Sequence, residues 1–166
     1  TCEFGNESNT GTEYVGGQCS ATAPTCGMTF TCNNGYKKNT AGTECVAIEY
    51  TITYDANGGK DVASRTYTIE DEFTLPATTR DGYTFNGWTE NGTAITQIVK
   101  GTTGNKTLVA QWTKCTNNYY CPGDNTEHKC PDGYTSDAGA TTETQCYKSC
   151  TKQCEKPTCP KNATCE

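Results

Sequence analysis

Cysteine is the residue type in this sequence with the greatest capacity for chemistry. The 166 residues include 13 cysteines, which fall into two groups, Cys2 to Cys45 and Cys115 to Cys165, with none in between. Cysteine at this density either binds a metal such as zinc or forms a disulfide framework. Because thiols become cross-links only in an oxidising environment, the sequence predicts a disulfide-rich protein of the cell surface or extracellular space.

A repeated cysteine spacing predicts three of the disulfides. Cys32-Asn-Asn-Gly-Tyr leads to Cys45 as Cys130-Pro-Asp-Gly-Tyr leads to Cys146, and the interval from Cys2 to Cys19 is similar. Since an interval with an internal turn can close on itself, we predict the pairs Cys2–Cys19, Cys32–Cys45 and Cys130–Cys146. The other cysteines have no assigned partner: Cys26, Cys115, Cys121, Cys150, Cys154, Cys159 and Cys165.

Residues that could support catalysis or metal binding are sparse. The cysteines from Cys150 to Cys165 lack the paired Cys-x2-Cys knuckles of structural zinc sites. The single histidine, His128, stands beside Glu127 without a second histidine or a nucleophile elbow. An enzyme would need a deep pocket that holds such titratable groups. We therefore expect no enzyme activity, no catalytic residue, no cofactor and no metal.

Charge and composition exclude two classes of partner. The net charge of -6 and pI near 4.8 argue against nucleic acid. No run of about 18 apolar residues is present, so no membrane span is expected in this fragment. The chain begins and ends in cysteine-rich sequence and its cysteine count is odd, from which we expect a piece of a longer protein.

The elements that position these residues are predicted to be β-strands. Between Tyr50 and Trp112 apolar residues alternate with polar ones, which is typical of half-buried strands. Asp55 to Gly59 lacks the later glutamate of a calcium loop and is expected to be a turn, with Asn57 and the glycines at positive φ. Ala94 to Val99 is expected to form at most a short helical turn. The predicted core consists of Ile52, Tyr54, Ile69, Leu75, Tyr83, Phe85, Trp88, Leu108 and Trp112.

Three segments follow from the cysteine distribution. We predict a cysteine-rich disulfide module at 1–49, a β domain at 50–113 and a second cysteine-rich disulfide module at 114–166. The fold class is mainly β, with loop-dominated flanking modules. The middle domain contains no cysteine, so it is predicted to fold without disulfides.

Four motifs of the middle segment resemble a known family. Tyr-Thr-Ile-Thr-Tyr-Asp-Ala-Asn-Gly-Gly (50–59), Leu75-Pro76, Gly-Tyr-Thr-Phe-Asn-Gly-Trp (82–88) and Leu-Val-Ala-Gln-Trp (108–112) resemble the internalin B-type B-repeat, or Listeria/Bacteroides repeat. The resemblance implies a small β-grasp-like domain that occurs in tandem on bacterial surface proteins, including adhesins. It carries no catalytic residues.

The cysteine-rich segments carry a second resemblance. Cys121-Pro-Gly and the sequence from Cys130 to Thr141 resemble the cysteine-rich repeats of ephrin-receptor-like and tumour-necrosis-factor-receptor-like proteins. This resemblance implies an elongated arrangement of small disulfide modules, without implying a particular ligand.

Two functions remain open at this stage. The first is a non-catalytic module of a microbial surface protein that presents an adhesive surface to a host protein or glycan. The second is a structural repeat of a surface stalk or extracellular fibre, which contacts neighbouring modules or copies of itself. An exposed aromatic or apolar patch would favour binding, whereas complementary contacts between modules would favour assembly.

Overall fold

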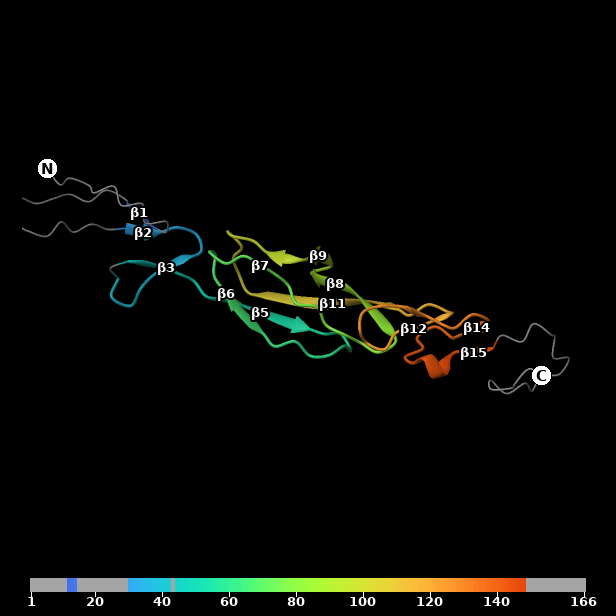
Figure 1. The fold of residues 1–166 in the computed structure, drawn as a ribbon. Helices are drawn as coiled ribbons and strands as arrows, with labels where there is room; N and C mark the ends of the chain where they lie inside the picture. The colour runs from blue at the N-terminus through green and yellow to red at the C-terminus, as the bar shows by residue number, and fades with distance from the viewer. Residues whose placement is uncertain (1–11, 15–29, 43, 149–166) are drawn as a thin grey trace, which may run out of the picture. The chain divides into compact units, whose positions relative to one another are not determined.

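The described residues form strands and turns almost throughout. A computed structural model describes residues 12–14, 30–42 and 44–148 (Figure 1). In that part of the chain the only helical element is a 3₁₀ turn, η1 (Glu143–Gln145), so the predicted mainly β fold class is confirmed. The strands are β1 (Thr12–Tyr14), β2 (Phe30–Cys32), β3 (Tyr36–Lys38), β4 (Cys45–Ala47), β5 (Tyr50–Asp55), β6 (Arg65–Tyr67), β7 (Phe73–Thr74), β8 (Tyr83–Glu90), β9 (Thr93–Ile95), β10 (Gln97–Ile98), β11 (Lys106–Lys114), β12 (Tyr119–Tyr120), β13 (His128–Lys129), β14 (Tyr134–Thr135) and β15 (Tyr147–Lys148). Within these residues no helix has the length and apolar character needed to cross a membrane.

The chain divides into two compact units. The first unit comprises residues 1–52, 65–73 and 97–106, and the second comprises residues 53–64, 74–96 and 107–166. The largest sheet has five strands in the order β6-β5-β11-β8-β9, and β5 and β11 contribute residues to both units. The segment boundaries at 49/50 and 113/114 stay a prediction.

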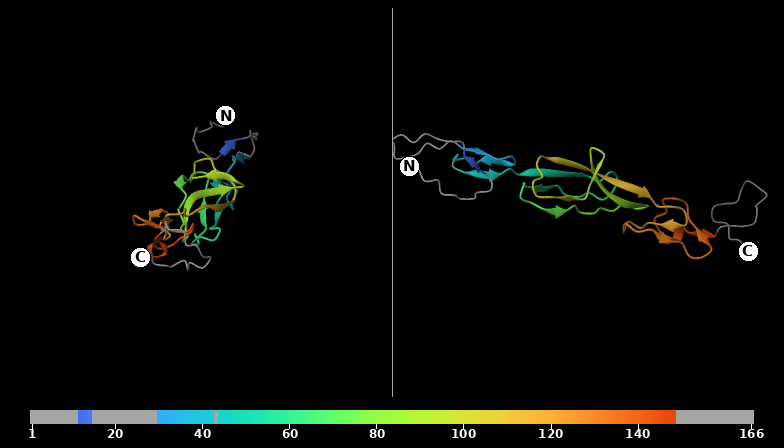
Figure 2. Two further views of the ribbon diagram at one scale, coloured as in Figure 1. Left: turned by 90° about the vertical axis from the view of Figure 1, so that its right-hand side faces the viewer. Right: turned by 90° about the horizontal axis from the view of Figure 1, so that it is seen from above.

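The other sheets each have two strands. They pair β1 with β2, β3 with β4, β7 with β10, β12 with β13 and β14 with β15. Figure 2 shows the last two pairs in orange and red. Two-stranded sheets of this size bury too little apolar surface to be stable alone. Disulfides can supply the missing stability where a core is lacking.

The core of the first unit is small and lies on β5, β6 and β10. Ile52, Tyr67 and Ile98 are buried, and the Tyr50 ring lies 5.6 Å from the Tyr67 ring. The Tyr67 hydroxyl donates a hydrogen bond to the Gly104 carbonyl, so the buried phenol keeps its polar end satisfied. Tyr67 and Ile98 are buried although neither belongs to the predicted core.

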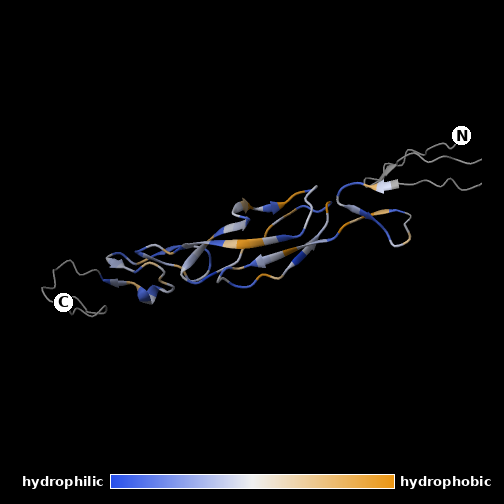
Figure 3. Ribbon diagram, turned by 180° about the vertical axis from the view of Figure 1, so that it is seen from behind, coloured by the Kyte–Doolittle hydropathy of each residue, from blue (hydrophilic) through white to orange (hydrophobic). Residues whose placement is uncertain are grey.

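The core of the second unit is aromatic. Tyr54, Trp88, Leu108 and Ala110 are buried, with the Tyr54 and Trp88 rings 4.9 Å apart. The Trp88 indole N–H donates to the Pro76 carbonyl at 2.7 Å. Figure 3 shows the apolar middle of β11 between polar ends, as the alternating pattern predicts.

Five residues of the predicted core are only half-buried. Three of them belong to strands of a sheet too small to enclose every apolar side chain, and the other two, Ile69 and Leu75, lie outside its five strands. The residues to which this correction applies are Ile69, Leu75, Tyr83, Phe85 and Trp112.

A bulge in β8 explains the position of Trp112. Ala110 pairs with Trp88 but Trp112 pairs with Phe85, so β8 carries one extra residue. Gly87 in this stretch has φ +95°, a left-handed conformation that glycine adopts without strain and that accommodates the bulge. Trp112 lies beyond the bulge, where its indole N–H donates to the Ala56 carbonyl at 3.0 Å.

Two local expectations need correction. Ala94 to Val99 includes the last two residues of β9 and all of β10, because Ile95 pairs with Trp88 across the ladder instead of forming a helical turn. In the Asp55–Gly59 turn, Asn57 (φ +48°) and Gly58 (φ +84°) are left-handed, but Gly59 is not. Gly59 is required for space, because a Cβ there would overlap the Trp112 ring.

Candidate functional site: two module junctions

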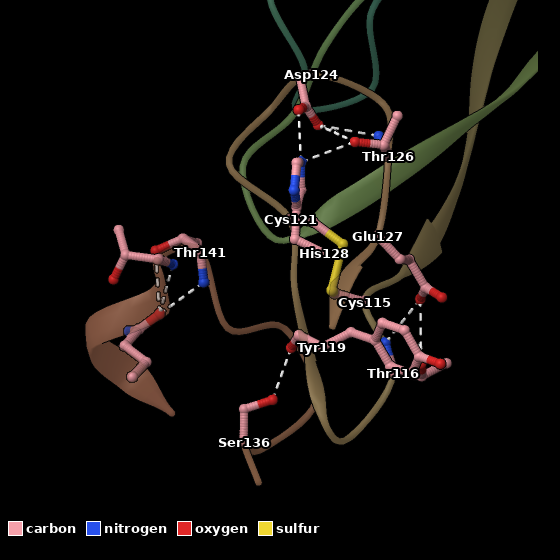
Figure 4. Close-up of a disulfide and its surroundings, with 12 residues drawn as sticks. Cys115, Thr116, Tyr119, Cys121, Asp124, Thr126, Glu127, His128, Ser136 and Thr141 are labelled. Atoms are coloured by element: carbon pink, nitrogen blue, oxygen red, sulfur yellow. Dashed lines mark hydrogen bonds and ion pairs between the residues drawn. A yellow bond between two sulfur atoms is a disulfide. The ribbon is translucent and has the colours of Figure 1, made fainter. Parts of the chain in front are cut away.

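The second unit contains a backbone clasp around Gly82. The Gly82 N–H donates to the Cys121 carbonyl at 2.8 Å, and the Cys115 N–H donates to the Gly82 carbonyl at 2.8 Å. Cys115 and Cys121 are joined by a disulfide and are buried, at 0% and 1% exposure (Figure 4). We call these three residues the Gly82 clasp. It fixes the start of β8 to the first residues after β11.

Only glycine fits at the centre of the clasp. Gly82 has φ +77°, which strains any residue with a Cβ. A Cβ at this position would also lie 2.8 Å from the Gly139 carbonyl oxygen. The preceding turn is held by the Arg80 guanidinium, which lies 3.9 Å from the centre of the Tyr83 ring.

Further polar contacts join the same segments. The Gly139 N–H donates to the Cys115 carbonyl at 2.8 Å, and the Asn125 side-chain amide donates to the Thr78 carbonyl at 2.9 Å. Thr78 is itself buried. Buried backbone groups are costly to leave unpaired, so these bonds favour one arrangement of the segments. The clasp is therefore part of a hydrogen-bonded network that extends into the cysteine-rich sequence.

A polar cluster lies beside the clasp disulfide. His128 Nε2 lies 2.6 Å from Asp124 Oδ2, and the Thr126 hydroxyl and amide also bond the Asp124 carboxylate (Figure 4). The hydrogen bond with His128 and those with Thr126 lower the pKa of Asp124 to about 2. The His128 ring stacks on Tyr120 with centroids 5.2 Å apart. The cluster therefore caps the hairpin of β12 and β13.

The two titratable residues singled out in the sequence have separate partners. Glu127 accepts hydrogen bonds from the Thr116 amide and hydroxyl at 3.0 and 3.1 Å, whereas His128 pairs with Asp124. The Glu127 carboxylate also approaches the sulfurs of Cys115 and Cys121, but these sulfurs form a disulfide and are not free thiolates.

The described part of the second unit includes hollows on its surface, of which two are well defined. One, of about 430 Å³, is lined by Asp137–Ala140, Thr144, Gln145 and Tyr147, and the other, of about 500 Å³, by Gly58–Lys60, Thr79–Asp81 and Tyr83. Neither His128 nor Glu127 lines them. In the first hollow the Tyr147 hydroxyl donates to Asp137, and this bond raises the pKa of Tyr147.

The first unit contains a different junction. Gly35, in the turn before β3, is buried against the side chain of Ile69. The Tyr36 hydroxyl donates to Glu70 Oε1 at 2.8 Å, and that hydrogen bond raises the pKa of Tyr36, followed by burial and the glutamate charge. We call the contact of Gly35 and Tyr36 with Ile69 and Glu70 the Ile69 junction. It consists of side-chain contacts, in contrast to the Gly82 clasp.

The disulfides of the described residues number three. Cys32 is bonded to Cys45 and Cys130 to Cys146, which are the pairs that the spacing predicts. The third bond, Cys115–Cys121, is not assigned from the sequence, and its separation of 6 recurs between Cys26 and Cys32 and between Cys159 and Cys165, so the interval alone does not single it out. The predicted Cys2–Cys19 pair and the unassigned cysteines Cys26, Cys150, Cys154, Cys159 and Cys165 lie outside the described residues.

Comparison with known proteins supports the middle segment as a B-type repeat. Residues 50–111 match the family model of the Listeria-Bacteroides repeat domain. No curated protein and no solved structure gave a significant match. The family is generally non-catalytic, and together with the disulfides it is consistent with an extracellular or surface protein. The likeness of the flanking segments to ephrin-receptor-like and tumour-necrosis-factor-receptor-like repeats stays a prediction.

Proposed function

We propose that this chain is a non-catalytic structural unit of an extracellular surface protein, in which a B-type repeat is firmly joined to cysteine-rich modules. Such a unit would hold other parts of a surface stalk or fibre at a defined orientation. The match of residues 50–111 to a surface-type repeat family supports the extracellular setting.

The Gly82 clasp is the observation that carries this proposal. In a flexible linker the backbone N–H and carbonyl groups form hydrogen bonds with water. In contrast, the N–H and the carbonyl of Gly82 both bond to cysteine-rich sequence. The cross-link between Cys115 and Cys121 restrains both partners of Gly82. A junction of this kind transmits orientation and force, which is what a structural repeat requires.

The burial of the aromatic side chains supports the same proposal. Trp88 and Tyr67 are each 2% exposed, and the Trp112 indole N–H is bonded to a backbone carbonyl. Among the described residues the large apolar side chains that are clearly exposed are Val99 and Tyr134. An adhesive surface usually presents a contiguous aromatic or apolar patch. The adhesive alternative therefore has less support than the structural one.

Residual dipolar couplings of the full chain would test the proposal. We expect the amides of 74–96 and 115–148 to fit one alignment tensor, because the clasp holds both segments in one body. Replacing Cys115 and Cys121 by alanine should separate the tensors. Replacing Cys32 and Cys45, the matched control pair, should leave them joined. Two tensors in the unmodified chain would refute a rigid junction.

Binding assays address the rival function. The full chain would be applied to glycan arrays and to immobilised host extracellular proteins at micromolar concentration. Saturable binding that Trp112→Ala or Tyr134→Ala removes, in a chain whose junction proves mobile, would favour the adhesive function instead.

A further inference from the structure

Two disulfide hairpins of the described residues share the same strand register. In one, Tyr36 pairs with Ala47, the second residue after Cys45, and in the other Tyr134 pairs with Lys148, the second residue after Cys146. Each hairpin is closed by its disulfide, Cys32–Cys45 or Cys130–Cys146. The paired tyrosine stands in the same place relative to both bonded cysteines in the two hairpins, although these cysteines are 13 residues apart in the first hairpin and 16 in the second.

The turns before the paired tyrosines also correspond. The Tyr36 N–H donates to the Asn33 carbonyl at 3.0 Å and the Tyr134 N–H to the Pro131 carbonyl at 2.9 Å. The glycine before each tyrosine is left-handed, with φ +85° at Gly35 and +83° at Gly133. Gly35 and Tyr36 of the first hairpin are thus equivalent to Gly133 and Tyr134 of the second.

In the first hairpin this face is occupied. Ile69 lies where a Cβ of Gly35 would be, and Glu70 accepts the Tyr36 hydroxyl. The residues that fill the face come from a turn closed on itself, because Asp71 Oδ2 accepts the Thr68 amide at 2.6 Å and its hydroxyl at 2.9 Å. The first hairpin therefore receives a tight turn that offers a branched aliphatic side chain followed by a carboxylate.

In the second hairpin the equivalent face is open. Gly133 is exposed, and nothing lies within 4 Å of a Cβ built on it. Tyr134 is 39% exposed. Where the first hairpin has Ala47, the second has Lys148, whose Nζ lies 5.9 Å from the centre of the Tyr134 ring. The open face thus adds a cation near Tyr134, the equivalent of the tyrosine whose hydroxyl donates to a carboxylate in the first hairpin.

We propose that Gly133 and Tyr134 form a docking surface for a second B-type repeat, which presents a turn like Thr68–Asp71. The aliphatic side chain of that turn would pack over Gly133, and its carboxylate would accept the Tyr134 hydroxyl and pair with Lys148. Charge complementarity distinguishes this face from its occupied counterpart, since Lys148 attracts the carboxylate and Ala47 does not. The inference deepens the proposed structural function by naming the neighbour that the unit holds.

The docking contact is expected to be weak between separate molecules. It covers one turn and so falls well below the area of a stable interface of about 1,200–2,000 Å². A dissociation constant on the order of a millimolar is therefore expected. Within one polypeptide or a fibre, a high effective concentration would fill the site.

An NMR titration of the isotope-labelled full chain would test the proposal. The probe is a cyclic peptide of residues 66–73, whose Thr68–Asp71 turn is first checked by nuclear Overhauser contacts. A second probe is the unlabelled Gly35→Val chain, in which the valine side chain displaces Ile69 and frees the Thr68–Asp71 turn. We expect both probes to shift the amide signals of Gly133, Tyr134 and Lys148. No shift with either probe at several millimolar, or shifts confined to other residues, would overturn the proposal.

Conservative variants sharpen the result. Tyr134→Phe, which removes only the hydroxyl, should weaken binding about threefold to tenfold. Lys148→Gln should abolish the salt dependence of binding. The matched control is Tyr120→Phe, whose ring stacks on His128, and it should leave binding unchanged. If the dipolar couplings fit one tensor but the amide signals of Gly133, Tyr134 and Lys148 do not shift, the docking proposal is wrong and the proposed structural function still holds.

Discussion

The two junctions of the molecule are built from different kinds of contact. At the Gly82 clasp the bonding groups are backbone N–H and carbonyl groups around a buried disulfide. At the Ile69 junction they are side chains, with one aliphatic contact on Gly35 and one hydrogen bond from Tyr36 to Glu70. Buried backbone hydrogen bonds are costly to break, so a substitution that disrupts them should destabilise the fold strongly. Side-chain contacts can be gained or lost by a single mutation at smaller cost.

The comparison indicates how a cysteine-rich segment can be attached in two ways. The clasp makes the attached segment part of the compact unit, since loss of its bonds leaves buried polar groups unpaired. At the Ile69 junction the contacts cover one face of a hairpin, formed by Gly35 and Tyr36. In the second hairpin the equivalent face, formed by Gly133 and Tyr134, is open. We expect the effects of mutation to fall steeply from the clasp to the Ile69 junction.

The largest effect is expected from Gly82→Ala. Left-handed strain costs about 1–2 kcal/mol, and overlap with the Gly139 carbonyl adds about 1–3 kcal/mol, so the free energy of unfolding should fall by about 2–5 kcal/mol. Urea unfolding followed by the fluorescence of Trp88 and Trp112 reports the second unit, because both tryptophans belong to it. Gly92→Ala is the matched control, because Gly92 has φ +81° with nothing within 4 Å. Equal losses in the two variants would contradict the role of the clasp.

A smaller effect is expected from Ile69→Ala. Ile69 is half-buried, so the loss should be about 1–2 kcal/mol, below the range for a fully buried isoleucine. Hydrogen exchange at the amides of Ile48 and Gly101 would measure it, because these donate to Gly35 and Ile69 within the first unit. Val99→Ala, at a residue 44% exposed, should change exchange little. If both variants behave alike, Ile69 is not a junction residue.

Tyr36→Phe should cost less again, about 0.5 kcal/mol, because the bond to Glu70 faces solvent. The raised pKa of Tyr36 means that the folded state holds this proton more tightly than the unfolded state. The stabilisation is thus complete below the usual tyrosine pKa and is lost as pH rises through the raised value. Ultraviolet titration should show Tyr36 ionising at lower pH in Glu70→Gln. An unchanged midpoint would mean that the hydrogen bond does not form.

The smallest effect on stability is expected from the exposed pair of Asp124 and His128. Because the folded pKa of Asp124 is about 2, its contribution is present above the usual aspartate pKa and is lost as pH falls through about 2. Carbon-detected NMR should find its midpoint near 2, and His128→Gln should raise it. Acid unfolding should hardly respond. A midpoint in the usual aspartate range in the unmodified chain would refute the pairing.

Much of the fold follows from local pattern. Alternation predicts β5 and β11 because Ile52, Tyr54, Leu108 and Ala110 point to one side while polar residues face water. The repeated interval predicts the Cys130–Cys146 bond because that hairpin closes on itself. The burial of Ile98 could not be predicted, since its apolar neighbours Ile95 and Val99 fit a short helical turn and nothing in the pattern separates Ile98 from the exposed Val99.

The junctions could not be predicted, for physical reasons. Asp81-Gly82 has the composition of any turn, and nothing local indicates that both polar groups of Gly82 bond residues far along the chain. Ile69 and Glu70 lie in an ordinary polar stretch, and their partner Gly35 comes from another segment. Long-range backbone contacts leave no mark on periodicity, so their positions emerge only from the folded chain.

The Gly82 clasp has a consequence for the lifetime of the protein among secreted proteases. A trypsin-like protease must draw several residues around Arg80 into an extended strand before it cleaves after the arginine. Here the guanidinium stacks on Tyr83 and donates to the Asn57 carbonyl at 3.0 Å, while the backbone two residues later is bonded on both sides. Cleavage at this bond therefore requires opening of the second unit, and reduction of Cys115–Cys121 would turn a protected arginine into a digestion site.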